Sequence, residues 1–169
     1  MMKTFPSALA GTALGALLTV SATAHAATVN VSFVDPDNFA DAGYSQSRPT
    51  ERDLTELRAE FERYLKRLAD ASLAPNAVLK LEMLDIDLAG QVEPGRRLGN
   101  DIRVVREVTI PRLKFRYSLQ EGDRVVANGE EYLTDLDFLH SVSRVGAEDR
   151  FRYEKSLLTS WFGKRFGKL

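Results

Sequence analysis

Four carboxylates form two Asp-x-Asp pairs, each at the end of an expected strand. They are Asp35 and Asp37 in one pair, and Asp85 and Asp87 in the other. If a right-handed crossover makes the two strands parallel, both pairs meet at one end of the sheet. Neighbouring carboxylates repel one another unless a cation or proton compensates, and Ca²⁺ binds roughly six to eight oxygen ligands. The pattern indicates a Ca²⁺ site, and no other cofactor is expected.

The same carboxylates allow two other interpretations. Asp35 and Asp37 can cap a turn, while Asp85 and Asp87 face guanidinium groups. The arginines available for this are Arg96, Arg97 and Arg103. Alternatively, Asp85 and Asp87 act as an acid and base with a rim arginine in a small hydrolase.

Positive charge is concentrated between residues 96 and 116. The cations are Arg96, Arg97, Arg103, Arg106, Arg112, Lys114 and Arg116. The last three alternate along one expected strand, and such a stripe could bind an anionic envelope component or a partner protein. Alternation also sends Phe115 and Tyr117 to the opposite face, and Glu130 or Glu131 on the returning strand can pair with the cations. The second interpretation is a solvated, ion-paired face.

Other catalytic chemistries have little support in the composition. The chain contains no cysteine and two histidines, so zinc and thiol chemistry lack their usual side chains. His140 stands beside Ser141 without a G-x-S-x-G motif. The formal net charge of −1 gives no global attraction to nucleic acid, which we regard as an unlikely partner.

Periodicity indicates the elements that hold these residues. Residues 28–34 alternate apolar and polar side chains, which predicts a strand that stops at Asp35. Thr50 and Asp53 form a capping-box pattern that opens a helix running to about Ala71. The apolar face of this helix recurs at three- and four-residue spacing. It consists of Leu54, Leu57, Phe61, Tyr64, Leu65 and Leu68.

The second half of the chain reads mainly as strands. Residues 79–88 predict a strand whose buried face changes at Met83 and Leu84, which indicates a bulge or burial on both sides. Residues 90–100 predict a loop, 102–110 a short strand, and 113–133 a hairpin. A final helix can be capped by Asp149 and packs an apolar stripe. The stripe is Leu157, Leu158, Trp161, Phe162 and Phe166, whereas Tyr153, Glu154 and Lys155 are expected at the surface.

These elements predict an α+β fold. We expect a two-layer sandwich, with a mainly antiparallel sheet of four to five strands and two amphipathic helices on one face. Residues 1–26 combine Lys3, an apolar run and Ala24-His25-Ala26, which is typical of a cleavable signal peptide. Residues 27–169 then form a single domain without disulfides, exported to the periplasm and without a transmembrane segment.

Four segments carry a resemblance to a known family. They are V-S-F-V-D-P-D (31–37), L-D-I-D-L-A-G-Q-V-E-P (84–94), D-I-R-V (101–104) and R-Y-E-K (152–155), with Trp161-Phe162 following. In this order they resemble the bacterial domain-of-unknown-function family 3016 over nearly the whole chain after residue 26. The resemblance implies a small exported proteobacterial protein, and it implies no activity and no catalytic residues.

The sequence thus favours a non-enzymatic binding or assembly component of the cell envelope. The partner would be another envelope protein or an anionic envelope component, bound through the basic residues. The alternatives from other classes are the small carboxylate-dependent hydrolase and a Ca²⁺-stabilised structural protein.

Overall fold

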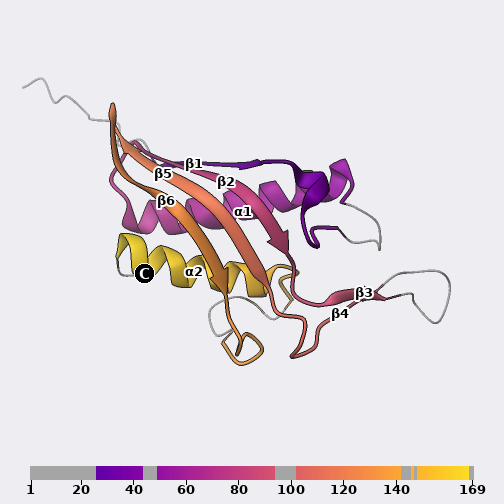
Figure 1. Ribbon diagram of the computed structural model, residues 1–169. Coiled ribbons are helices and arrows are strands. Elements are labelled where there is room, and N and C mark those ends of the chain that lie inside the picture. Colours follow the sequence, from indigo (N-terminus) through magenta and orange to yellow (C-terminus); the bar gives the residue numbers. More distant parts are fainter. Residues whose placement is uncertain (1–25, 44–48, 94–101, 142–145, 147, 168–169) are drawn as a thin grey trace, which may run out of the picture.

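The computed structural model describes residues 26–43, 49–93, 102–141, 146 and 148–167. Four strands form the main sheet in the order β1-β2-β5-β6. They are β1 (Thr28–Phe33), β2 (Ala77–Asp87), β5 (Arg112–Glu121) and β6 (Arg124–Thr134). β1 runs parallel to β2, and the other neighbours are antiparallel. The helices α1 (Glu51–Ser72) and α2 (Arg152–Phe166) cover one face of the sheet (Figure 1), which confirms the predicted α+β class.

The first helix begins as its sequence predicts. The Asp53 N–H donates to Thr50 Oγ1 at 3.2 Å, and the Thr50 N–H donates to Asp53 Oδ2 at 2.8 Å, which completes the capping box. The apolar face of α1 is buried against the sheet, with Leu57 and Phe61 almost inaccessible to solvent. Burying each such side chain stabilises the fold by about 2 kcal/mol, so packing rather than helix propensity holds α1 in place.

A bulge in β2 decides which side chains reach the open face of the sheet. Met83 lies opposite Phe115, but Asp85, two residues on, lies opposite Lys114, the next residue back along β5. The predicted change of buried face is therefore a bulge. It lets Met83 and Ile86 both face the helices, while Asp87 points away from the core and lies opposite a cation of β5.

The hairpin β5–β6 supplies the aromatic part of the core. Phe115 and Tyr117 face the helices and meet the Trp161 ring edge-on, at centroid distances of 4.9 and 5.3 Å. The hairpin turns at Gly122, whose φ of 59° is a conformation that glycine adopts without steric cost. The predicted hairpin and the predicted apolar stripe of α2 are both confirmed.

Two short strands were not predicted correctly. β3 (Gln91–Glu93) and β4 (Ile102–Val104) form a separate two-stranded sheet beyond the end of β2 (Figure 1). β3 falls within the predicted loop, since a three-residue strand leaves almost no periodic signal. The predicted strand over 102–110 is too long. The chain turns after β4, where the Thr109 hydroxyl donates to the Arg106 carbonyl at 2.8 Å and the Arg106 N–H donates to Thr109 Oγ1 at 2.9 Å.

The predicted signal peptide lies outside the described residues, except for Ala26. Within the described ranges, no helix is both long and apolar enough to cross a membrane.

Candidate functional site

The two Asp-x-Asp pairs come to the same end of the sheet, because β1 and β2 are parallel. Asp35 adopts a left-handed conformation with φ 53°, and its carboxylate accepts a hydrogen bond from Asn38 Nδ2 at 2.6 Å. Asp37 lies in the short 3₁₀ helix η1 (Pro36–Asn38). Asp85 accepts the Ala40 N–H at 2.9 Å. Among the described residues, no group of three or more acidic or histidine side chains is placed to hold a metal ion, and Ca²⁺ binding stays one of the interpretations that the sequence leaves open.

The basic residues of β5 each face a carboxylate on a neighbouring strand. The ion pairs are Arg112–Asp87 at 2.7 Å, Lys114–Glu130 at 3.2 Å, and Arg116 with Glu82 at 3.4 Å and with Glu130 at 3.8 Å. Phe115 and Tyr117 are buried on the other face. This geometry favours the ion-paired interpretation of the stripe. Arg96 and Arg97 lie outside the described residues.

Arg103 has a different place from the one expected. It does not pair with Asp85 or Asp87 but grips Asp41 with two parallel contacts, Nη1–Oδ2 at 3.0 Å and Nη2–Oδ1 at 2.8 Å. The same guanidinium donates to the Gly90 carbonyl at 3.0 Å and the Gly43 carbonyl at 2.7 Å. A planar fork with several donors suits this arrangement, which a lysine could not reproduce.

The first turn of α2 is buried rather than at the surface, so that prediction for Tyr153, Glu154 and Lys155 is wrong. Glu154 is 2% exposed, and its Oε1 accepts the Ala89 N–H at 2.7 Å. Burial raises the pKa of Glu154, although the Ala89 N–H and the Arg103 charge oppose this. The spacing of apolar residues along a helix cannot reveal such a site, because the residue that marks it is a charged side chain at a position that the fold buries.

Lys155 anchors the same turn on its other side. Its side chain is 3% exposed, and Nζ lies 2.6 Å from Asp149 Oδ2 and 2.9 Å from Glu60 Oε2. The hydrogen bond to Lys155 is the main reason that the pKa of Glu60 is lowered. Asp149 also accepts the Phe151 N–H at 2.9 Å, but it is not the helix cap that the sequence predicted, because α2 begins at Arg152 and its N-cap residue is Phe151, which makes no side-chain cap.

Together these contacts join four separate parts of the chain. Arg103 connects Asp41 to the backbone of residues 88–90, and Glu154 accepts a hydrogen bond from the Ala89 N–H of the same segment. Gly90 sits at the tightest point, with φ +87°, and a Cβ there would lie 2.9 Å from the Val104 carbonyl oxygen. The network therefore fixes the backbone after β2 in one position.

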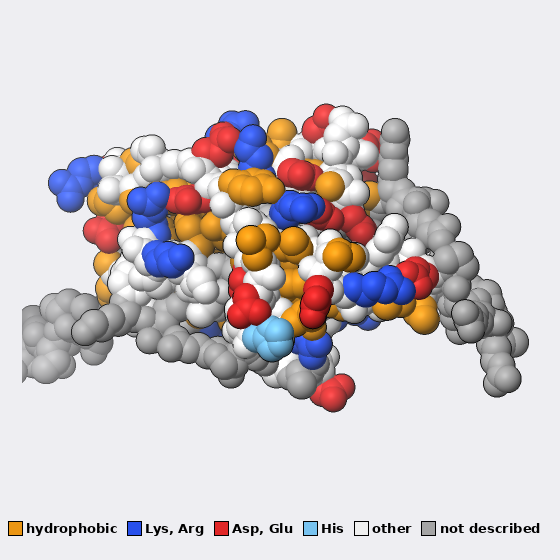
Figure 2. Space-filling view, turned by 60° about the horizontal axis from the view of Figure 1, so that its bottom comes forward, with side chains coloured by type: hydrophobic (Ala, Val, Ile, Leu, Met, Phe, Trp, Pro, Cys, Tyr) orange, Lys and Arg blue, Asp and Glu red, His pale blue; other side chains and the backbone are white. Residues whose placement is uncertain are grey.

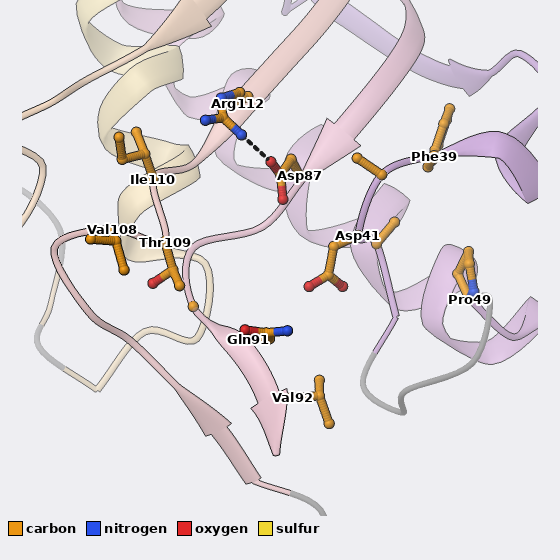
Figure 3. A pocket seen from close by; sticks show the side chains of 13 residues that line it. Phe39, Asp41, Pro49, Asp87, Gln91, Val92, Val108, Thr109, Ile110 and Arg112 are labelled. Carbon is orange, nitrogen blue, oxygen red and sulfur yellow. Dashed lines mark hydrogen bonds and ion pairs between the residues drawn. The ribbon is translucent and has the colours of Figure 1, made fainter.

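A pocket of about 670 Å³ opens beside this network (Figure 3). It is lined by residues 39–42, Pro49, Asp87, 90–92 and 108–112 except Pro111. Figure 3 shows the carboxylates of Asp41 and Asp87 turned toward the hollow, with Arg112 bonded to Asp87. Apolar and polar walls thus meet in one concave site of the size that small ligands occupy.

Asp87 is a carboxylate of this pocket whose pKa is shifted by its surroundings. Burial raises its pKa, the hydrogen bond from Arg112 opposes the rise, and the negative charges of Asp41 and Asp85 add to it. Asp41 is already held by Arg103, and Asp85 by the Ala40 N–H. Asp87 and Arg112 are therefore the pair that can exchange partners with a ligand. The sequence marked both residues but placed them in separate sites.

The remaining surface shows mixed charge. On the face in Figure 2, cationic and acidic side chains lie interspersed, with hydrophobic side chains among them. His140 is exposed and its Nδ1 pairs with Asp137 Oδ1 at 2.7 Å, while the Ser141 hydroxyl donates to the Asp137 carbonyl at 3.1 Å rather than to His140. Along the outer edge of β6, Val125, Val126 and Tyr132 are exposed, and no described strand pairs with that edge.

Comparison with known proteins gives a family and no activity. No curated protein and no solved structure matches the chain. A family model described as "protein of unknown function (DUF3016)" matches residues 27–164. The match covers all the elements around the pocket, from β1 through most of α2. The chain therefore belongs to the DUF3016 family of proteins of unknown function.

Proposed function

We propose that this protein is an exported, non-enzymatic binding protein of the bacterial cell envelope that holds a small polar ligand in the pocket beside Asp87 and Arg112. One observation carries the proposal. Arg103 and Glu154 hold the backbone of residues 88–90, which leads directly into the pocket wall at Gly90, so that wall is preorganised. A pocket that needs no ordering on binding loses less affinity to conformational entropy.

The periplasmic address is supported by the sequence of residues 1–26. Expression of the full chain with a C-terminal tag in a Gram-negative host tests it. We expect the tagged protein in the osmotic-shock fraction, with an intact mass that begins at Ala27. An uncleaved protein in the cytoplasmic fraction would contradict the address.

A thermal-shift assay tests the binding role. The probe is the small-molecule fraction of an envelope extract, added to the purified protein. We expect the extract to raise the melting temperature of the wild type but not that of Val108→Lys. Val108 lines the pocket and is 80% exposed, so a lysine there fills the entrance without disturbing the core. Ile102→Lys is the matched control, because Ile102 is 55% exposed and does not line the pocket.

The open edge of β6 supports an assembly role as a second candidate. Exposed apolar side chains on an edge strand are a surface to which an extended segment of another envelope protein can add. A pull-down from envelope extract at physiological salt tests this. A partner retained by the wild type and by Ile102→Lys but lost from Tyr132→Lys would support it, and equal recovery from all three would contradict it.

The raised pKa of Asp87 favours a third candidate, the small hydrolase. A carboxyl group that stays protonated nearer to neutral pH is suited to act as a general acid. Asp85, which the sequence paired with it, does not line the pocket, so Asp87 and Arg112 would carry the reaction. Hydrolase substrates turned over by the wild type but not by Asp87→Asn would support this function over binding.

A further inference from the structure

Besides Asp41, which Arg103 holds, the pocket presents one negative and one positive side chain that neutralise each other. Asp87 and Arg112 lie opposite each other on β2 and β5, and a hydrogen bond of 2.7 Å joins Arg112 Nη1 to Asp87 Oδ2. Their side chains are 23% and 44% exposed. This contact joins one nitrogen to one oxygen, unlike the two-point fork between Arg103 and Asp41. The pair is therefore accessible and less constrained than its neighbour.

A ligand with a single charge fits this pair poorly. An amine that binds Asp87 would take the carboxylate from Arg112, and an anion that binds Arg112 would take the guanidinium from Asp87. In each case one charge is left partly desolvated without a partner, which costs free energy. A ligand that carries an ammonium and a carboxylate group close together replaces one ion pair by two.

The rest of the pocket adds an apolar wall and an amide. Phe39 and Val92, which are largely buried, line one side of the pocket, and Val108 and Ile110 line the opposite side (Figure 3). The exposed Gln91 side chain also lines the hollow and offers both a donor and an acceptor. An apolar side chain of the ligand would be stabilised by burial against this wall.

We infer that the pocket binds a zwitterionic α-amino acid with an apolar side chain, its ammonium group on Asp87 and its carboxylate on Arg112. The inference rests on the proposed binding function and names its ligand class. The ammonium and carboxylate groups of an α-amino acid are carried by one carbon atom, so they can reach two side chains that lie in direct contact.

Isothermal titration calorimetry at pH 7 and 0.15 M NaCl with three matched probes tests this. The probes are L-leucine, 3-methylbutylamine, which lacks the carboxylate, and 4-methylpentanoate, which lacks the amine. We expect L-leucine to bind at least tenfold more tightly than either analogue. Equal binding of the amine or of the carboxylate would overturn the inference, because a single charge would then suffice.

Variants of the purified protein locate the site. Asp87→Asn and Arg112→Gln should each weaken L-leucine binding at least tenfold, and Val108→Lys should do the same through an exposed position that cannot unfold the core. Arg116→Gln removes a cation from the same strand outside the pocket and should bind as the wild type does. Unchanged binding in all three pocket variants would overturn the inference.

The envelope extract separates the two levels of the proposal. If the extract stabilises the wild type but not Val108→Lys while L-leucine does not bind, the ligand class is wrong and the binding function stands. If neither the extract nor L-leucine has an effect, both are overturned.

Discussion

Arg103 and Asp41 lie 62 residues apart in the chain and meet through two parallel contacts of 3.0 and 2.8 Å. The pair is mostly buried, with side chains 17% and 26% exposed. Because Arg103 also donates to the carbonyls of residues 88–90 and to that of Gly43, it connects β4 to the segment after β1 and to the end of β2. Together with Glu154, this side chain holds the backbone that leads into the pocket wall.

Arg103→Ala should lower the free energy of unfolding by about 3 kcal/mol, since it leaves Asp41 and several carbonyls without their donor. Arg103→Lys should lose much of this as well, because an ammonium group cannot form the fork. Urea unfolding followed by circular dichroism measures the effect. Arg63→Ala, at a pair whose arginine is 60% exposed, is the control and should change the free energy by less than about 1 kcal/mol.

Lys155→Met should destabilise the protein by about 3 kcal/mol at pH 7, because it leaves Glu60 and Asp149 without their shared cation. The stabilisation that Lys155 provides should also depend on pH in a definite direction. The pKa of Glu60 is lowered in the folded state, so its contribution is present above the unfolded pKa and is lost as pH falls through the folded value. The difference in the free energy of unfolding between Lys155→Met and the wild type should therefore become smaller in acid. A difference that is constant from pH 7 to pH 3 would contradict this.

Calcium should leave the melting temperature unchanged. Asp35, Asp85 and Asp87 each have a protein partner, and the described residues contain no group arranged to hold a metal ion. Binding at ten times its dissociation constant would stabilise the fold by about 1.4 kcal/mol and raise the melting temperature by roughly 3 °C or more. A rise of that size in 10 mM CaCl₂, absent in Asp85→Asn, would establish the calcium site instead.

The protein should pass through a heparin column at about 0.15 M salt. Arg112, Lys114 and Arg116 face Asp87, Glu130 and Glu82, so the stripe has no excess of positive charge along these strands. The variant Glu130→Gln removes the acidic partner that Lys114 and Arg116 share, so the stripe becomes more positive and the protein should be retained more strongly. Retention of the wild type at physiological salt would restore the polyanion interpretation.

Periodicity predicted the elements well and the polar network hardly at all. The capping box at Thr50 is a local pattern that the sequence shows directly, whereas the change of buried face at Met83 allowed either a bulge or burial on both sides until the strand register was known. The contact between Glu154 and Ala89 spans 65 residues, and Arg103 could be assigned to Asp41 only when the path after β1 was known. A charged residue in the first turn of a helix is predicted to be exposed, and only the tertiary structure shows whether that end of the helix is buried.

Glu154→Gln tests the buried carboxyl group through pH. The pKa of Glu154 is raised by burial, so the folded state binds its proton more tightly than the unfolded state does. Its contribution is therefore favourable at low pH and decreases as pH rises above the unfolded value of about 4.3. Glutamine keeps an oxygen that accepts the Ala89 N–H but does not ionise.

The melting temperature of Glu154→Gln relative to wild type should thus increase as pH is raised from 4 to 7.5. Glu154→Ala separates charge from hydrogen bonding, because it also removes the acceptor and leaves the Ala89 N–H buried without a partner, at a cost of about 1–3 kcal/mol. It should be destabilised at every pH in this range. If the glutamine variant instead lost stability relative to wild type as pH rises, Glu154 would be ionised in the folded protein and stabilised there by the positive charge of Arg103.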